Sequence, residues 1–219
     1  MKKILLGLAA AALLSASAVN ATEYGFDKAH THIGFSVKHI LSKVPGEFKD
    51  YDGTFSFDPA KPEASKIDVT IQASSINTDN EMRDHHLQSK DFFDAEKYPT
   101  LTFKSTSVAK GTGDNHYKVV GDLTMHGVTK SVTLDVDYMG EDKMQMGKDG
   151  PTAKVAGFSA TTTLDRRDFG LSWGQDKLTA AGNLMVANEV NVQLDIAGMD
   201  KASLDGMKKM MGKKKDEKK

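Results

Sequence analysis

Apolar residues occupy every second position through several stretches of the chain. Val132, Leu134 and Val136 alternate with polar residues, and residues 33–37 and 190–196 repeat the pattern. Successive side chains of a strand point to opposite faces, so a period of two indicates strands with one apolar face and one wet face. Many such strands in one chain must bury their apolar faces against each other. The pattern therefore predicts an all-β sandwich or a closed barrel.

Turn-forming residues separate the strands, because proline and glycine supply the backbone angles of chain reversals. His126-Gly127 predicts a tight hairpin between two of them. No internal repeat or linker interrupts the series, so residues 22–200 are predicted to form one domain. The expected strands lie near residues 24–38, 47–57, 65–74, 99–110, 116–126, 128–140, 152–164 and 184–198.

Residues 78–88 break this rhythm, because TDNEMRDHHLQ lacks alternation and contains good helix formers. Thr78 is a plausible N-cap, with Glu81 three positions further on. We therefore expect a short helix near residues 78–88. A helix that interrupts an all-β chain often covers an opening or an exposed sheet edge.

The first 21 residues have the layout of a secretory signal peptide. A positive head with Lys2 and Lys3 precedes an apolar run over residues 4–14, and small residues follow as far as Ala21. This layout predicts export and cleavage after Ala21, with Ala18 as the second choice. The alternative is a membrane anchor, but the run falls short of the ~20 residues that a spanning helix needs.

Composition narrows the class of protein further. The 219 residues include no cysteine, so an exported domain of this sequence relies on packing and sheet hydrogen bonds rather than disulfides. The net charge is -1, of which the head contributes +2 and residues 207–219 contribute +5, leaving -8 for the rest. An acidic body argues against nucleic acid as a partner.

Residues 201–219 differ from the rest, being rich in lysine and methionine. The favoured interpretation is a disordered, solvated tail. The alternative is a transient tether to the membrane surface, because each lysine near anionic headgroups contributes about 1 kcal/mol.

Enzyme signatures are absent from the sequence, which has no G-x-S-x-G elbow, phosphate loop, H-E-x-x-H or cysteine nucleophile. We therefore predict a protein that is not an enzyme. Seven histidines raise the question of a metal. His30/His32 and His85/His86 form two pairs, but a metal site requires three or four convergent ligands. We predict no metal and no cofactor, and a secreted metal- or redox-linked protein that uses these pairs remains an alternative function.

The chain has only three arginines, Arg83, Arg166 and Arg167. The planar guanidinium suits carboxylate or phosphate recognition. Arg83 lies on the predicted helix and the other two lie where a strand ends. All three could therefore lie at the opening of a binding site. Internal ion pairs, Arg83 with Asp84 or Arg166 with Asp168, are the competing interpretation.

Four ordered motifs resemble the YceI-like family. They are HTHIGFSVKH over residues 30–39, HLQSKDFFDAEKYP over 86–99, VGDLTMHGVT over 120–129 and the R-x-D-F-G element over 166–170. The resemblance covers about residues 23–198, and the lysine- and methionine-rich tail lies outside it.

The resemblance implies a single extended, antiparallel, eight-stranded lipocalin-like barrel in the periplasm. Its interior would hold a long-chain isoprenoid lipid of the polyprenyl phosphate or quinone type. The family's members bind, store or carry such lipids, some of them in stress responses. Eight strands can also enclose a filled core, so an interaction module without a ligand stays open as an alternative. A homodimer stays open too, because barrels associate through strand edges and loops.

A lipid that leaves a membrane moves its tail from one apolar place to another, so we expect headgroup contacts to decide selectivity. The residues expected at the headgroup are Arg83, His86, Arg166 and Asp168, and whether Arg166 or Arg167 points inward stays open. The expected lining residues, which in a filled core would pack on each other instead, are Phe35, Val37, Phe55, Phe57, Val69, Ile71, Phe103, Val132, Val136, Val192 and Leu194.

Overall fold

The computed structural model describes residues 21–148 and 150–216, without the side chains of 211–216. The predicted signal peptide falls almost wholly outside these residues. Antiparallel strands make up most of the fold, with two α-helices and short 3-10 turns among the described residues. The elements are β1 (Thr22–Phe26), β2 (His32–His39), β3 (Ser42–Phe48), β4 (Tyr51–Phe57), β5 (Lys66–Gln72), β6 (Ile76–Asn77), α1 (Glu81–Gln88), β7 (Thr100–Lys110), β8 (His116–Met125), β9 (Val128–Gln145), β10 (Thr152–Asp165), β11 (Val186–Asp200) and α2 (Lys201–Asp216), with 3-10 turns η1 (Pro62–Ala64), η2 (Ala73–Ser75) and η3 (Arg166–Phe169).

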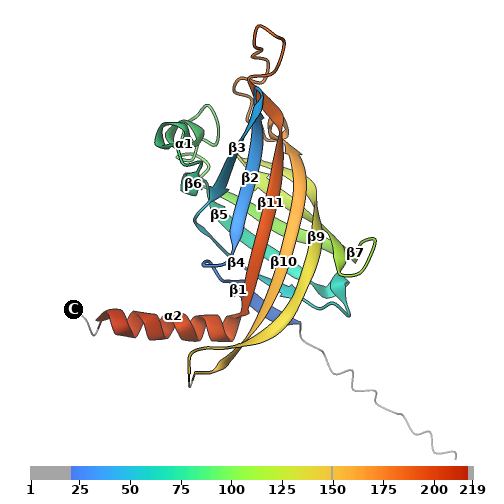
Figure 1. The fold of residues 1–219 in the computed structure, drawn as a ribbon, viewed down its shortest axis with the longest axis vertical. Coiled ribbons are helices and arrows are strands. Elements are labelled where there is room, and N and C mark those ends of the chain that lie inside the picture. The colour runs from blue at the N-terminus through green and yellow to red at the C-terminus, as the bar shows by residue number, and fades with distance from the viewer. Residues whose placement is uncertain (1–20, 149, 217–219) are drawn as a thin grey trace, which may run out of the picture.

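Within the described chain, eight strands form a closed ring in the order β1-β4-β5-β7-β8-β9-β10-β11. The ring closes because β11 pairs with β1, placing Tyr24 opposite Asp200 and Phe26 opposite Gly198. Figure 1 shows the long strands β9, β10 and β11 running side by side along the barrel. The closed, antiparallel, all-β architecture confirms the predicted eight-stranded lipocalin-like barrel.

The first strands of the barrel are bent, which differs from the prediction. The segment expected as one strand over 24–38 is divided at residues 27–31, where the Asp27 carboxylate accepts hydrogen bonds from the Ala29 N–H and the His30 ring. The segment over 47–57 is likewise divided into β3 and β4. One long partner spans the first bend, since β11 pairs with β2 over most of its length and with β1 at its end.

The expected short helix is present as α1, but its cap differs from the prediction. Asn80 is the N-cap, and its side-chain oxygen accepts a hydrogen bond from the Arg83 backbone N–H at 3.0 Å. The Thr78 hydroxyl instead donates to the Asp84 carboxylate and is buried. α1 lies beside β6, at the end of the barrel opposite α2 (Figure 1).

Residues 201–216 form α2, which differs from the disordered tail expected there. The Asp200 carboxylate caps this helix by accepting a hydrogen bond from the Ser203 N–H at 2.9 Å. Leu204 lies against Gly25 of β1, where a larger side chain would collide with it. This docking gives the helix an apolar contact that its own sequence does not reveal. None of the described helices is long and apolar enough to cross a membrane.

Aromatic rings fill the end of the barrel nearest α2. The Phe57 ring lies 5.0 Å from Tyr117, 4.9 Å from Tyr138 and 5.1 Å from Phe158, measured between ring centres. Tyr24 stacks on Phe55 at 5.2 Å in the same region. Phe55, Phe57, Tyr117 and Phe158 also belong to the wall of the interior cavity.

Candidate ligand cavity

A cavity of about 490 Å³ lies inside the barrel. Alternate residues of β11 from Val190 to Ile196 face it, and Val186 continues the wall past an irregularity in the pairing. From Val186 to Ile196 the wall extends about 33 Å, at about 3.3 Å per residue. The period of two in the sequence is what turns these side chains to one face of the strand.

Every residue predicted to line the interior is on the wall of this cavity. The structure thus places the expected residues around open space, and a completely filled core is excluded. Their contact with a lipid stays a prediction. These wall residues are Phe35, Val37, Phe55, Phe57, Val69, Ile71, Phe103, Val132, Val136, Val192 and Leu194.

Arg83 and Arg166 stand out on this wall, because the described lining includes no Asp, Glu or Lys. The two arginines lie at the same end of the cavity. Arg166 donates to the Trp173 carbonyl, and the Trp173 ring lies 5.1 Å from His86, which is on α1 with Arg83. We call this end, marked by Arg83, His86, Arg166 and Trp173, the mouth. Its positive charge suits an anionic or oxygen-rich group.

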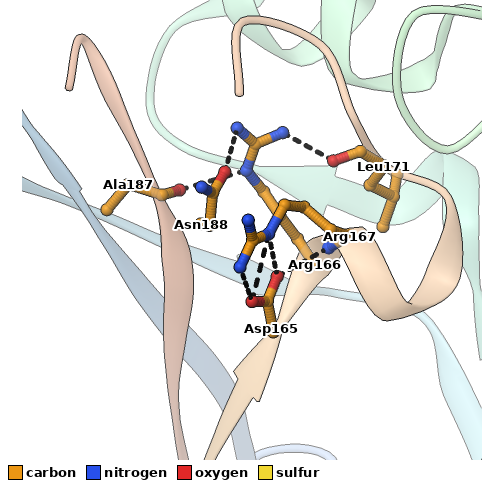
Figure 2. Close-up of polar contacts among 6 residues, drawn as sticks. All are labelled: Asp165, Arg166, Arg167, Leu171, Ala187 and Asn188. Atoms are coloured by element: carbon orange, nitrogen blue, oxygen red, sulfur yellow. Dashed lines mark hydrogen bonds and ion pairs between the residues drawn. The ribbon is translucent and has the colours of Figure 1, made fainter. Parts of the chain in front are cut away.

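Arg166 is the first residue of η3, directly after β10, and is only 5% exposed. Its guanidinium donates to the carbonyls of Leu171 and Ala187 and to the Asn188 side-chain oxygen (Figure 2). It also donates to the Trp173 carbonyl. A guanidinium has five N–H groups, so these contacts leave one of them for another acceptor. Burial lowers the pKa of Arg166, and the nearby Asp165 carboxylate opposes that effect.

Arg167 is exposed and pairs with Asp165, with 2.5 Å between its Nη2 and the carboxylate (Figure 2). Arg166 is therefore the arginine that faces the cavity, which answers the question left open by the sequence. Asp168 is exposed and is not on the described wall, so its predicted role at the headgroup is not supported. The ion pair of Arg166 with Asp168, which was the competing interpretation, is replaced by Arg167 with Asp165, because Asp165 caps the turn and accepts from the Arg167 N–H.

Arg83 is held at the mouth by Thr78. Its Nε donates to the Thr78 hydroxyl and its Nη2 to the Thr78 carbonyl, both at 2.7 Å. Asp84 accepts hydrogen bonds from the Thr78 N–H and hydroxyl. Among the described residues no salt bridge joins Arg83 to Asp84, so the proposed ion pair is replaced by a network centred on Thr78.

Aromatic rings surround His86 at the mouth. Its Nε2 lies 2.8 Å from the Asp91 carboxylate, and its ring meets Phe92 and Trp173 edge-on at 5.0 and 5.1 Å. The Lys177 ammonium lies 4.5 Å from the centre of the Trp173 ring. Sequence reasoning missed Trp173, and the only available signal was that it is the single tryptophan of the chain.

The histidine pairs do not converge on a common site. His30 contacts Asp27, while His32 contacts Glu47 on β3. His116 lies against Asp137 on another part of the barrel. In the described ranges, no group of three or more His, Cys, Asp or Glu side chains could hold a metal ion. The geometry therefore gives no support to the metal-linked alternative.

A closed antiparallel barrel around an apolar cavity with one polar mouth defines a lipocalin-like binding protein. The model of the YceI-like domain family matches residues 24–198, and the chain belongs to this family. The family resemblance seen in the four sequence motifs is thereby confirmed.

Relatives and solved structures agree with this membership. The chain is 48% identical over 175 residues to a UPF0312 protein of Pseudomonas putida, covering 78% of this chain and 88% of the relative. The YCEI protein of Campylobacter jejuni is 39% identical with a TM-score of 0.62, over 80% of this chain and 96% of that one. BcnA of Burkholderia cenocepacia has 26% identity and a TM-score of 0.65, over 78% and 98%.

A more distant structure is similar in fold alone. It is the polyisoprenoid binding domain from Saccharophagus degradans implicated in plant cell wall breakdown, with 16% identity and a TM-score of 0.57. The match covers 81% of this chain and 98% of that domain.

Proposed function

We propose that this protein is a non-enzymatic carrier that holds one long-chain isoprenoid lipid in its barrel. Its family and the polyisoprenoid binding of a structural neighbour support a lipid ligand. The observation that carries the proposal is the uneven wall of the cavity. Apolar side chains line its length, whereas Arg83 and Arg166 stand at one end without a carboxylate on the described wall. The tail lies along the barrel and the headgroup lies at the mouth.

The free energies of tail burial and of headgroup hydrogen bonds indicate that the mouth determines which lipid is bound. Burying a forty-carbon tail from water would yield ~30 kcal/mol, which exceeds the limit of about 18–21 kcal/mol for non-covalent affinity. Water is therefore the wrong reference, because the tail of such a lipid already lies in a membrane. Transfer into an apolar barrel is close to neutral, so each charged hydrogen bond of about 1.5–3 kcal/mol decides which lipid is retained.

Between the two headgroup types, the mouth favours a polyprenyl phosphate over a quinone. Both offer oxygen acceptors, but the phosphate also carries charge. Buried Arg166 has four neutral hydrogen-bond partners and no carboxylate among them. An anion at this end compensates the buried positive charge, which a neutral quinone does not.

The periplasm is the proposed location, because residues 1–21 have the pattern of a cleaved export signal. Fractionation of expressing cells, with mass measurement of the mature N-terminus, tests this point. We expect a periplasmic protein that begins at Thr22. A cytoplasmic protein of full mass would contradict the assignment.

Lipid extraction tests the function directly. Protein purified without detergent is extracted with organic solvent, and the extract is analysed by mass spectrometry. We expect an isoprenoid lipid from the wild type. Arg83→Gln should retain about tenfold less of a phosphorylated polyprenol, because it loses a charged hydrogen bond.

Arg167→Gln is the matched control, since Arg167 is exposed and does not line the cavity. Its lipid load should equal that of the wild type, and circular dichroism should show the same β spectrum for all three proteins. An extract without isoprenoid, or an unchanged load in Arg83→Gln, would refute the proposed function or its headgroup assignment respectively.

A further inference from the structure

Exposed apolar side chains gather where the cavity opens. Leu41 is 84% exposed at the β2–β3 turn, and Leu178 and Met185 in the segment before β11 are 58% and 36% exposed. The two segments are joined, because the Ile40 N–H donates to the Met185 carbonyl at 3.2 Å. Met185 also lines the cavity. We call Ile40, Leu41, Leu178 and Met185 the rim.

The turn at Ile40-Leu41 has a sequence that is unfavourable for a two-residue hairpin. It joins His39 to Ser42 as a two-residue hairpin, and Ile40 has a φ of 53°. Such turns favour Asn-Gly or Asp-Gly, and a positive φ is unfavourable for a β-branched residue. A strained, partly buried Ile40 followed by a largely exposed Leu41 at the tip of a hairpin indicates a contact surface.

Lysines flank this turn without acidic partners. Lys38 and Lys43 lie directly opposite each other in the β2–β3 ladder and both are exposed. Like charges at opposed positions destabilise a hairpin. Neither lysine has a salt bridge to any described residue. A surface with negative charge would offset this repulsion.

We propose that the rim docks on an anionic phospholipid bilayer, with Ile40 and Leu41 entering the headgroup region and Lys38 and Lys43 contacting phosphates. This inference rests on the proposed function and specifies how the ligand reaches the cavity. A tail that leaves the bilayer at the rim enters the apolar wall at Met185 and Val186 without crossing water.

The position of α2 supports the rim as the membrane contact in place of the lysine-rich tail. β11 begins near the rim and runs 15 residues to the start of α2. This separation is about 45 Å at about 3.3 Å per residue. α2 and the β2–β3 turn lie at opposite ends of the molecule (Figure 1). Contact through α2 would therefore point the mouth away from the bilayer.

Vesicle binding by the mature protein tests the docking. The vesicles contain phosphatidylethanolamine and phosphatidylglycerol, and bound protein is measured by flotation. Ile40→Asn/Leu41→Gly gives the hairpin a favoured turn sequence, so the fold is retained. We expect its affinity to fall at least about tenfold, since apolar burial is lost. Met139→Ser is the control, because Met139 is 73% exposed on β9 and is not a rim residue.

Charge variants separate the rim from α2. Lys38→Gln/Lys43→Gln should weaken binding about fivefold per lysine at low salt. Lys208→Gln/Lys209→Gln on α2 should bind like the wild type. A loss confined to the α2 variant, or unchanged binding by Ile40→Asn/Leu41→Gly, would overturn the docking surface. A rim variant that binds vesicles normally but fails to acquire lipid from cell envelopes would indicate a protein receptor and would also overturn it.

The lipid extract of the same protein keeps the two proposals apart. A lipid-loaded wild type that does not bind anionic vesicles refutes the docking and leaves the carrier function intact. A wild type that binds vesicles through Ile40 and Leu41 but contains no isoprenoid supports the docking surface and refutes the carrier function.

Discussion

Neighbouring arginines have different environments at the residue scale. Arg166 is buried and donates four hydrogen bonds, whereas Arg167 is exposed and pairs with Asp165. Arg166→Ala leaves buried carbonyls without donors and should lower the free energy of unfolding by about 3 kcal/mol. Arg167→Ala should cost less than about 1 kcal/mol, as exposed ion pairs do. Urea unfolding followed by Trp173 fluorescence measures both, and equal losses would contradict the assignment.

The alternation of apolar and polar residues correctly predicted the direction of side chains on strands. It did not predict the direction of side chains on turns. Val132 and Leu194 were identifiable because the period of two fixes the face to which each strand residue points. Asp168 and Trp173 follow a strand end, where no period fixes direction. The R-x-D-F-G motif located the mouth, but the order of side chains around η3 required the structure.

At the scale of elements, α2 shows that the local sequence does not reveal packing partners that are distant in the chain. Leu204 of α2 contacts Gly25, which is almost at the other end of the domain in sequence. Only the fold therefore reveals this contact. The breaks after β1 and β3 were also missed, although polar residues lie at both of them, Asp27-Lys28 after β1 and Lys49-Asp50 after β3. The His126-Gly127 hairpin was predicted correctly, since its turn residues are local, with φ values of 52° and 75°.

Low pH should loosen the start of α2 through Asp200. Burial raises the pKa of the Asp200 carboxyl, but hydrogen bonds from the Ser203 and Lys154 N–H groups lower it by more. The net result is a pKa below the ordinary value for an aspartate. The stabilisation of α2 by the ionised Asp200 cap is complete above a pH of about 3.9, the pKa of an aspartate in the unfolded chain. It is lost as the pH falls through the lower pKa of Asp200 in the folded protein. The Ser203 amide signal in an NMR titration should shift in that range. Asp200→Asn, whose cap does not ionise, should show no such shift, and an identical titration in both proteins would refute the cap.

At the scale of the whole molecule, the middle of the cavity should limit ligand length. Val132 of β9 lies on the wall and packs against two clusters of buried residues, one that contains Phe55 and one that contains Tyr117. Val132→Trp blocks the passage between the mouth and the far end, so the extracted lipids should shift to shorter chains. Thr133→Trp is the control, because the next residue of the strand points outward. An unchanged distribution of chain lengths in Val132→Trp would place the tail elsewhere.

Removing the lipid should weaken the barrel without unfolding it. A ligand that binds only the folded protein adds stability, about 2.7 kcal/mol when its concentration is about 100-fold above Kd. Extracted protein should therefore keep its β spectrum but melt at a lower temperature than before extraction, and added polyprenyl phosphate should restore the melting temperature. A melting temperature that is insensitive to both steps would contradict a ligand inside the cavity.

The sequence alone indicated a sandwich or a barrel and did not decide between them. Alternation describes one strand at a time, whereas closure depends on the pairing of Gly25 with Met199, which are almost a full domain apart. Eight strand segments were predicted from the sequence, but their closure into a barrel came from the family resemblance. Whether the interior is hollow depends on how side chains meet across the barrel, so the cavity was an expectation until the structure placed its wall.

The junction of β1 with β11 has a consequence for biosynthesis. The first strand must wait for the last, so the ring cannot be completed until nearly all of the chain has emerged. Contacts of such large sequence separation form slowly, and the unpaired edges of β1 and β11 are open to aggregation during the delay. Trimming β1 by a few residues would make that transient hazard permanent, because it would turn a continuous wall into a sheet with free borders.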